Sequence, residues 1–257
     1  MGPKEYRTLH AEWYELRSGK GDHSEEIEYW AKCIEEAGEP ALELGSGTGT
    51  KLVPLLERGL DVVGIDTSQE MTARCIAACD ARGLKPEVHA QSMLEFDLSR
   101  EFGLIFLDSG GLGLFTSDQD IETLFERVMS QLKQGGLFIY EFQPVPDKPW
   151  NDTNWTGNAV RGPDDVLIAL RVHRTYDASS NVWEQVYILE KFVDGALVQT
   201  EANERTGRFF SVDEAVHYAE AAGFEEIAAT NWLTADPPDK NSKVITVRCK
   251  KPLDEGR

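Results

Sequence analysis

The sequence predicts an α/β fold: a mostly parallel sheet with helices on both faces and an antiparallel sheet inserted late in the chain. Strand-like apolar segments alternate with helix-like segments from about residue 40 to residue 142. A glycine-rich run follows the first of these strands. Long β-rich stretches then replace the alternation after residue 142.

The alternating part of the chain contains buried strands joined by helices. Two amphipathic segments, residues 9–16 and 23–37, are predicted to form helices before the first strand. The segments that follow are predicted as strand 40–44, helix 50–58, strand 62–66, helix 68–82, strand 86–90, strand 104–107, helix 118–132 and strand 137–142. Strands that alternate with helices in this way form a parallel sheet, because each helix crosses over one face of it.

The pattern changes after residue 142. Residues 144–165 contain four prolines and are predicted to form a loop. Asp194-Gly195, between two strand-like stretches, is a strong hairpin signal. We therefore expect an inserted antiparallel sheet of about three strands, at 166–176, 182–193 and 196–208. The remaining elements are predicted as a helix at 211–222, capped by Ser211, and an antiparallel strand pair at 224–232 and 242–250.

Composition limits the possible functions. The formal net charge is −19, from 26 Lys and Arg against 45 Asp and Glu, and such a surface repels nucleic-acid phosphates. No apolar stretch approaches the roughly 20 residues that a membrane span needs, and residues 1–10 lack the apolar core of an export signal. We expect a cytoplasmic protein with one core, which binds neither nucleic acid nor membrane. No metal site is expected, because the cysteines lack metal-ligand spacing and are predicted to be buried: Cys33, Cys75, Cys79 and Cys249.

A glycine-rich loop follows the first predicted strand. Glu43 ends that strand, and Gly45, Gly47 and Gly49 alternate with Ser46 and a threonine before the next helix. Without side chains at three positions, the main chain can turn tightly and a ligand can lie directly against it. Three glycines can also form only a tight turn, so the loop alone does not establish a nucleotide site.

A carboxylate at the end of the next strand completes the pattern. Asp66 follows the apolar run 62–65 and is placed to accept hydrogen bonds from both hydroxyls of a ribose. It could instead only cap the helix that follows, through Thr67 and Ser68. A dinucleotide fingerprint would place its third glycine at position 50, which is a threonine here. The loop and Asp66 together, on one strand-helix-strand unit, predict a nucleoside ligand other than NAD.

The pattern acid-x-Gly-x-Gly-x-Gly, followed by a second acid one strand later, resembles the first motif of class I S-adenosylmethionine (SAM) methyltransferases. Residues 9–250 as a whole resemble the small-molecule members, and most of all the glycine and amino-sugar N-methyltransferases, whose closing helix has the form of residues 208–214 and 221–224. The resemblance implies seven strands in the order 3-2-1-4-5-7-6 and an insertion after strand five that covers the substrate. It also implies SAM as cofactor, with S-adenosylhomocysteine as product.

The resemblance divides the chain into three parts: N-terminal helices at 1–39 that cap the cofactor site, a SAM-binding core at 40–143 and 209–257, and an inserted antiparallel β lid at 144–208. The expected cofactor-binding residues are Tyr14, Glu43, Gly45, Ser46, Gly47, Gly49, Asp66, Thr67, Met71, Gln91, Ser92, Met93, Asp108 and Ser109.

The chain departs from the family at the adenine. Members usually carry Gly-Asp after the third strand, whose aspartate binds the adenine amino group, whereas this chain has Gln91-Ser92. Either the Gln91 carbonyl or the Ser92 hydroxyl could accept that hydrogen bond, but an uncharged acceptor should hold it more weakly. Met71 and Met93 are placed either against the adenine or in the core.

The expected catalytic residues are Tyr14, Asp108 and Glu141. Asp108 ends a buried strand, so it either points into the cleft or caps a turn. Glu141 lies near the end of another buried strand, where a carboxylate needs a partner, which could be a cationic amine substrate or a structural arginine. Tyr14 resembles the family tyrosine beside the cofactor, although it could belong to the core.

The sequence offers no clear general base. Some amino-sugar enzymes of the family have a histidine after strand four, where this chain has Leu114. His173 and Arg171, on the first inserted strand, face either solvent or the pocket, and polar strand positions usually lie on the wet face. An enzyme without a buried base favours amines, which lose a proton readily.

The predicted function is methyl transfer from SAM to a small molecule, most of all to an amine nitrogen, by positioning and exclusion of water. The alternatives are methyl transfer to oxygen and the use of SAM for chemistry other than methylation. An NAD-dependent oxidoreductase is disfavoured, because Thr50 replaces the third glycine and no Tyr-x-x-x-Lys pair follows strand five. The acceptor and the oligomeric state stay open.

Overall fold

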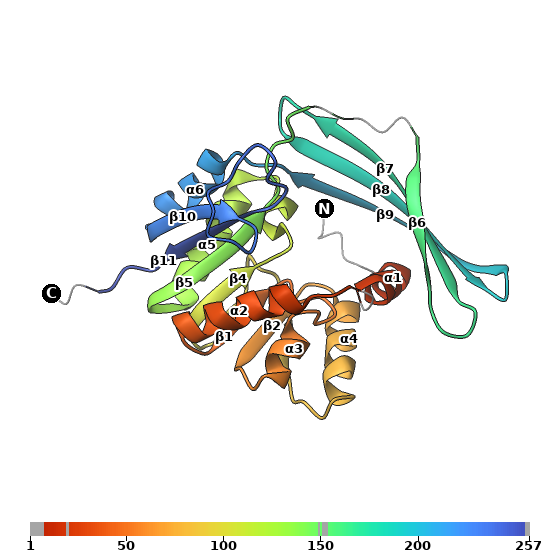
Figure 1. Cartoon of the computed structure of the whole chain (residues 1–257), viewed down its shortest axis with the longest axis horizontal. Coiled ribbons are helices and arrows are strands. Elements are labelled where there is room, and N and C mark those ends of the chain that lie inside the picture. Colours follow the sequence, from red (N-terminus) through yellow and green to blue (C-terminus); the bar gives the residue numbers. More distant parts are fainter. Residues whose placement is uncertain (1–7, 19–20, 149, 151–153, 255–257) are drawn as a thin grey trace.

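The computed structural model describes residues 8–18, 21–148, 150 and 154–254, which form a central sheet and a second sheet that stands beside it (Figure 1). The strands of the central sheet are β1 (Ala41–Leu44), β2 (Val62–Asp66), β3 (Glu87–Ala90), β4 (Phe102–Leu107), β5 (Leu132–Phe142), β10 (Glu225–Asn231) and β11 (Ile245–Lys250). The helices are α1 (Thr8–Ser18), α2 (Ser24–Ala37), α3 (Leu52–Glu57), α4 (Gln69–Asp80), α5 (Asp118–Gln131) and α6 (Val212–Ala221).

The central sheet has the order β3-β2-β1-β4-β5-β11-β10. Strands β1 to β5 are parallel to one another, and β11 runs antiparallel to both β5 and β10. This confirms the predicted Rossmann-like α/β fold and its strand order. The carboxyl ends of the five parallel strands therefore share one edge of the sheet with the end of β10 and the start of β11.

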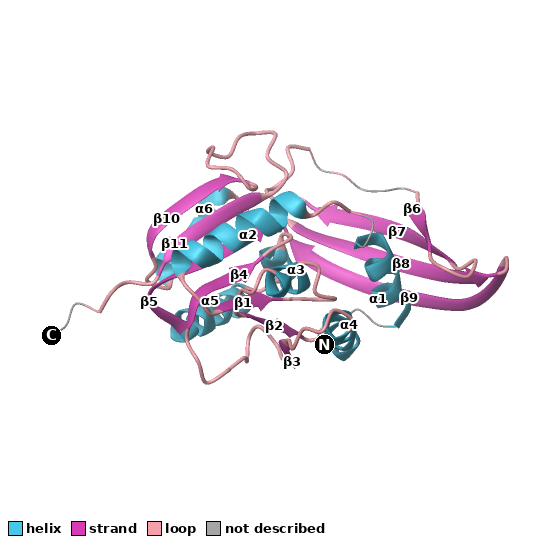
Figure 2. Cartoon of the chain, turned by 60° about the horizontal axis from the view of Figure 1, so that its bottom comes forward, coloured by secondary structure: helices cyan, strands magenta, loops and turns pink. Residues whose placement is uncertain are grey.

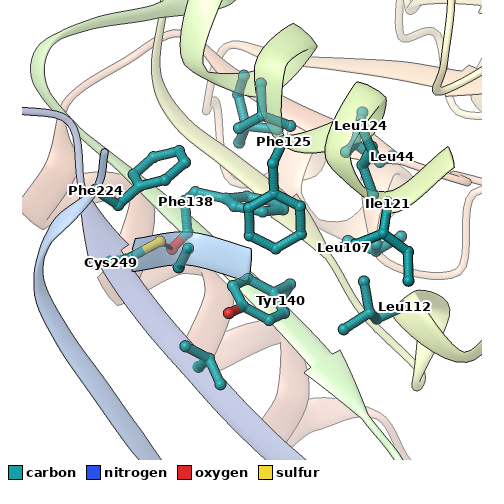
Figure 3. Packing of buried hydrophobic residues seen from close by; sticks show 14 of the residues in the cluster. Leu44, Leu107, Leu112, Ile121, Leu124, Phe125, Phe138, Tyr140, Phe224 and Cys249 are labelled. Atoms are coloured by element: carbon teal, nitrogen blue, oxygen red, sulfur yellow. Dashed lines mark hydrogen bonds between the residues drawn. The ribbon is translucent and has the colours of Figure 1, made fainter. Parts of the chain in front are cut away.

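Helices cover both faces of the sheet, which explains why its central strands are apolar throughout. On one face, α2, α3 and α4 pack against β1, β2, β4 and β5, with Trp30 stacked on Phe106 at 4.4 Å between ring centroids. On the other face, α5 and α6 pack against the same sheet. Phe125 of α5 lies edge-on to Phe138 and Tyr140 of β5 (Figure 3). The buried Tyr140 hydroxyl donates to the Ala215 carbonyl at 2.7 Å, so its polar end is satisfied.

The second sheet is antiparallel and has four strands in the order β6-β7-β8-β9, namely β6 (Thr156–Arg161), β7 (Leu167–Asp177), β8 (Val182–Val193) and β9 (Ala196–Arg208). We predicted three strands in this sheet and a loop through 144–165. Both predictions were wrong, because residues 156–161 within that range form β6, the fourth strand. Only Val160 of β6 is buried, so this edge strand lacks the apolar alternation that marks a strand in sequence. Its pairing with β7 comes from main-chain hydrogen bonds.

Two local predictions in this region are confirmed, the hairpin at Asp194-Gly195 and the helix cap at Ser211. Asp194 and Gly195 both have positive φ, at 50° and 77°, as a two-residue hairpin of this type requires. Ser211 caps α6 by accepting the Glu214 amide, and Glu214 accepts the Ser211 amide in return.

Helix α1 joins the second sheet to the core (Figure 2). Leu9 and Trp13 pack on Ile168, Leu170 and Leu189 of the sheet. On its other side, Glu15 of α1 pairs with Arg74 of α4. The second sheet is thereby held at a defined place relative to the sheet edge that carries the carboxyl ends.

The four cysteines are buried and unlinked, as predicted. None of the helices in the described part of the chain is long and apolar enough to span a membrane.

Candidate functional site

The glycine loop between β1 and α3 has the backbone that its sequence predicts. Gly45, Gly47 and Gly49 have φ values of +75°, +54° and +83°, which residues with a side chain adopt at a cost. A Cβ at Gly49 would also lie 2.6 Å from the Cys75 sulfur, and one at Gly45 would lie 2.8 Å from the Met93 methyl group. Gly45 and Gly49 therefore require glycine for both conformation and space, whereas at Gly47 only the positive φ favours glycine.

The loop amides are used largely within the protein. The Gly45 and Ser46 amides donate to the Ile65 carbonyl at 2.8 and 2.9 Å, and the Gly49 amide donates to the Ser46 carbonyl at 2.9 Å. The loop can bind a ligand through its bare surface and through the carboxylates around it.

Asp66 connects the glycine loop to the start of α4. Its Oδ2 accepts the Gly47 amide at 3.0 Å, and its Oδ1 accepts the Ser68 amide at 2.8 Å. Each carboxylate oxygen has a second lone pair, so Asp66 can hold this turn and still accept hydroxyl groups. Thr67 lies between these contacts, half-buried, and Ser68 caps α4 through the Met71 amide.

The residues expected around the adenine lie at the ends of β2 and β3. Met93 is partly buried and contacts the core beside Gly45, and Met71 is 2% exposed on α4. The Ser92 hydroxyl accepts the Leu94 amide at 3.2 Å and so stabilises its own turn. The Gln91 Oε1 atom is buried and has no hydrogen-bond partner among the described residues. Gln91 is therefore the better acceptor of the two.

A buried cluster of charged residues lies at the same edge, and the sequence analysis missed its central residue. Lys51, which is 7% exposed, follows the glycine loop. Its Nζ lies 2.7 Å from Asp108 Oδ2 and 3.0 Å from Glu26 Oε2 of α2, and donates to Ser109 Oγ at 3.3 Å. Its only sequence signal was its place just after the glycines. We call Glu26, Glu43, Lys51, Asp108 and Glu141 the carboxylate cluster.

Glu141 and Asp108 are joined through a strained turn. Glu141, 1% exposed, accepts the Ser109 amide on Oε2 at 2.8 Å. Ser109 has φ of +54° and Gly110 has φ of +72°, so two successive residues after β4 are left-handed. The turn directs an amide at Glu141 and leaves its Oε1 without a hydrogen-bond partner among the described residues.

The cluster contains more negative charge than its lysine can balance. Burial, followed by the nearby Asp108, raises the pKa of Glu43 well above its usual value. The same two causes raise the pKa of Glu141 to about 8. Burial opposes the charge of Lys51, but Asp108, Glu26 and Glu43 together raise its pKa above the usual value. At neutral pH Lys51 is charged, whereas Glu43 and Glu141 are largely protonated. Protonation removes the negative charges that the single lysine cannot balance.

These side chains share one face of the sheet. Along β5, Phe138 and Tyr140 face α5 while Ile139 faces α2, so Glu141 faces α2 as well. Its partner in the β11 register is Thr246, whose buried hydroxyl also lacks a hydrogen-bond partner among the described residues. The buried polar groups thus form a row across the carboxyl ends of β1, β4 and β5 and the start of β11.

Comparison with known proteins identifies the central part of this site. A family model described as a methyltransferase domain matches residues 41–136, which run from β1 through the glycine loop to the start of β5. Residues 41–136 are thus similar to a methyltransferase domain. The predicted enzyme class is thus confirmed.

Two relatives match this chain, one over almost its full length and one over a shorter segment. A protein of Geobacillus sp. (strain WCH70), provisionally named a methyltransferase, is 21% identical over 247 residues, covering 94% of this chain and 98% of its own. The carboxy-S-adenosyl-L-methionine synthase of Nautilia profundicola is 32% identical over 100 residues, covering 38% of this chain and 42% of its own.

Solved structures resemble the whole chain, including the second sheet. A SAM-dependent methyltransferase from Clostridium acetobutylicum has a TM-score of 0.77 at 17% identity, covering 93% of this chain and 96% of its own. The sugar N-methyltransferase KedS8 from Streptoalloteichus sp. has a TM-score of 0.76 at 18% identity, covering 99% of this chain and 96% of its own. These similarities support the class I fold.

Two groups of predicted residues lie away from the carboxylate cluster. Tyr14 is partly buried on α1, where it packs with the apolar cluster between α1 and the second sheet. Arg171 is exposed and pairs with Glu190 at 3.2 Å, and His173 lies next to Trp155. Arg171 and His173 alternate with the β7 residues that face α1, so they lie on the outer face of the second sheet.

The carboxylate cluster makes the stability of the protein depend on pH. Because the pKa of Glu141 rises from 4.5 to about 8 on folding, the unfolded chain releases this proton at a lower pH than the folded chain does. The contribution of Glu141 to stability therefore falls by about 1.4 kcal/mol per pH unit as pH rises through this range. The Glu141→Gln variant should gain stability relative to the wild type from pH 5 to pH 9 in urea unfolding.

The matched control is Glu35→Gln, an exposed glutamate on α2. Its difference from the wild type should be the same at every pH. If the Glu141→Gln and wild-type stabilities change in parallel with pH, Glu141 ionises in the folded protein as it does in water.

Proposed function

We propose that this chain transfers a methyl group from SAM to the amine nitrogen of a small molecule. One observation carries the proposal: the bare glycine loop and Asp66 lie at the same sheet edge as a carboxylate cluster that lacks enough cations. SAM as the methyl donor is supported by the methyltransferase domain and by the Clostridium acetobutylicum structure.

The part of this edge that carries the glycine loop and Asp66 fits a nucleoside. In this proposal Gly45 and Gly47 let the ligand lie against the main chain, and Asp66 accepts the ribose hydroxyls. Met71 and Met93 are available for the faces of the adenine, and the unpartnered Gln91 oxygen for its amino group. The carbonyl of Gln91 takes the place of the usual aspartate there.

The part of the edge that carries the carboxylate cluster fits cations. Removing a carboxylate from water costs several kcal/mol unless a positive charge faces it. Lys51 faces Asp108 and Glu26, while Glu43 Oε2 and Glu141 Oε1 have no hydrogen-bond partner among the described residues. SAM carries an ammonium and a sulfonium group, and an amine acceptor brings a further ammonium. Anionic acceptors would be repelled.

The reaction needs a neutral amine in line with the methyl carbon. SAM supplies the methyl group when bound, and its sulfur keeps the electron pair of the broken bond. Once ionised, which happens as the pH rises through its pKa of about 8, Glu141 can accept the proton that the incoming ammonium must lose, and this pKa matches an amine better than that of an exposed carboxylate does. The Ser109 amide holds Glu141 in place, and the nearby Asp108 raises its pKa.

The second sheet is proposed to exclude water from the reacting groups. Its inner face packs on α1, and α1 contacts α4 next to the nucleoside site. In this proposal the N-terminal part, residues 1–39, caps the cofactor, and the inserted part, residues 144–208, covers the acceptor. Tyr14 would act from α1, on the inner side of this cover.

Chemistry other than methylation is the second candidate. The similarity to the Nautilia profundicola carboxy-S-adenosyl-L-methionine synthase, at 32% identity over 100 residues, favours keeping it. The two functions differ in what happens to SAM. A methyltransferase releases S-adenosylhomocysteine and a methylated acceptor, whereas the alternative modifies SAM itself.

The test is calorimetry with S-adenosylhomocysteine, followed by mass spectrometry of the products formed from SAM with small amines, amino sugars, phenols and carboxylic acids. We expect saturable binding, and an amine that gains one methyl group while S-adenosylhomocysteine accumulates. Absence of binding at millimolar ligand would exclude the nucleoside site. Transfer only to oxygen, or a modified SAM without an acceptor, would exclude N-methylation.

A further inference from the structure

A pocket of about 280 Å³ opens between the start of α2 and the chain that follows β10. Its described lining consists of Asp22, Ser24, Glu25, Glu26, Trp232 and Leu233. Three of these residues are carboxylates and none is basic. Trp232 is 42% exposed, which is unusual for so large an apolar side chain.

The pocket lies at the functional edge of the sheet. The first turn of α2 lies at this edge, because its Glu26 pairs with Lys51, which directly follows the glycine loop. Trp232 follows the last residue of β10 at the same edge. Glu26 belongs both to the pocket and to the carboxylate cluster, since its carboxylate lies 3.0 Å from Lys51 Nζ.

Polar residues lie on the three strands nearest to the pocket. Thr230, two residues before Trp232, is paired in register with Thr246, and Thr246 is paired with Glu141. The Thr246 hydroxyl and Glu141 Oε1 are each on a residue 1% exposed and have no hydrogen-bond partner within the described ranges. Such groups are costly unless a ligand satisfies them. Thr230, Thr246 and Glu141 thus form a row across β10, β11 and β5, at the sheet edge where Trp232 follows β10.

We propose that the methyl acceptor enters through this pocket as a small organic ammonium ion, with its charge against Glu25 and Glu26 and its carbon skeleton on the Trp232 indole. This inference rests on the proposed function and names the acceptor class and its place. Asp22 contributes a stable negative charge, because hydrogen bonds from Ser24 lower the pKa of its carboxyl. An indole attracts cations through its face and also covers carbon chains. The reactive nitrogen then points along the row to Glu141.

The pocket can be tested without the cofactor, in the full-length chain. The indole N–H resonances are recorded by NMR, and that of Trp232 is identified by its loss in Trp232→Phe. The probes are 1,4-diaminobutane, the neutral 1,4-butanediol and the anionic succinate, at about 150 mM salt to screen distant charges. We expect the Trp232 resonance to shift only with the diamine. Glu25→Gln should weaken this binding about three- to tenfold, as for a partly exposed charge pair.

The matched control is Glu35→Gln, which removes the same charge from an exposed position on α2 outside the pocket. It should change diamine binding less than about twofold. The proposal is overturned if the diol or succinate shifts the Trp232 resonance as much as the diamine does. It is also overturned if that resonance does not respond to the diamine, or if Glu35→Gln weakens binding as much as Glu25→Gln.

Calorimetry with S-adenosylhomocysteine separates this inference from the proposed function. Glu25→Gln and Trp232→Phe should bind S-adenosylhomocysteine as the wild type does, because neither residue lies at the glycine loop. If the wild type binds S-adenosylhomocysteine but the pocket does not select the diamine, the acceptor site is wrong and the function stands. If the pocket selects the diamine but the wild type does not bind S-adenosylhomocysteine, the proposed function is wrong.

Discussion

Replacing Asp66 with alanine is expected to weaken S-adenosylhomocysteine binding by roughly 100-fold or more. The carboxylate holds the Gly47 and Ser68 amides at 3.0 and 2.8 Å, and in the proposed complex it also accepts the ribose hydroxyls. Hydrogen bonds to a charged group contribute about 1.5–3 kcal/mol each, and two of them correspond to at least a 100-fold change. Calorimetry measures the effect directly, and methyl transfer should fall with it.

Asp66→Asn refines this experiment. The amide keeps one acceptor oxygen but places an NH₂ group opposite one of the two main-chain amides, so it should also lose most of the affinity. The matched control is Asp61→Asn, at the start of the same strand segment, where the carboxylate makes an ion pair with Arg100 at 2.8 Å. If Asp66→Ala binds S-adenosylhomocysteine as tightly as Asp61→Asn, the ribose is held elsewhere.

Replacing Lys51 with methionine is expected to destabilise the fold by about 3–5 kcal/mol at pH 8, because it leaves buried carboxylates without their cation. Lys51 lies within 3.0 Å of both Asp108 and Glu26. At pH 5 the loss should be smaller, because Glu43 and Glu141, whose pKa values are raised by burial and by Asp108, are protonated there and the cluster carries less negative charge. Urea unfolding at the two pH values measures both effects.

Lys32→Met is the matched control, since Lys32 pairs with Glu28 at 3.3 Å on the exposed side of α2. Its removal should change stability by less than about 1 kcal/mol at either pH. Adding Asp108→Asn to Lys51→Met should restore part of the lost stability, because one of the unpaired charges is removed. Equal stability of Lys51→Met and Lys32→Met would show that the carboxylate cluster does not depend on the lysine.

The strand order and the glycine loop were predictable because their causes are local. Alternating apolar strands and helices have few ways to fold other than a parallel sheet. Gly45, Gly47 and Gly49 adopt positive φ within a single strand-helix unit, so their conformational requirement is visible in seven residues of sequence. Asp66 follows on the next strand of the same unit.

The edge strand β6 and the residue Lys51 were not predictable in this way. Strand β6 is held by hydrogen bonds to β7, and its side chains are mostly exposed, so they carry no strand pattern. Lys51 gains its role from Glu26 and Asp108, which come from other elements. A lysine after a glycine loop is ordinarily a solvated residue.

The amino-acid pattern was sufficient for the class of fold and for the nucleoside loop, because hydrophobic periodicity and glycine conformation act over a few neighbouring residues. Folding was needed to bring Glu26, Lys51, Asp108 and Glu141 into contact and to place Trp232 over the first turn of α2. The energy of a buried charge depends on which groups surround it in space. The groups around these charges come from separate helices, strands and loops, and only the packed fold brings them together.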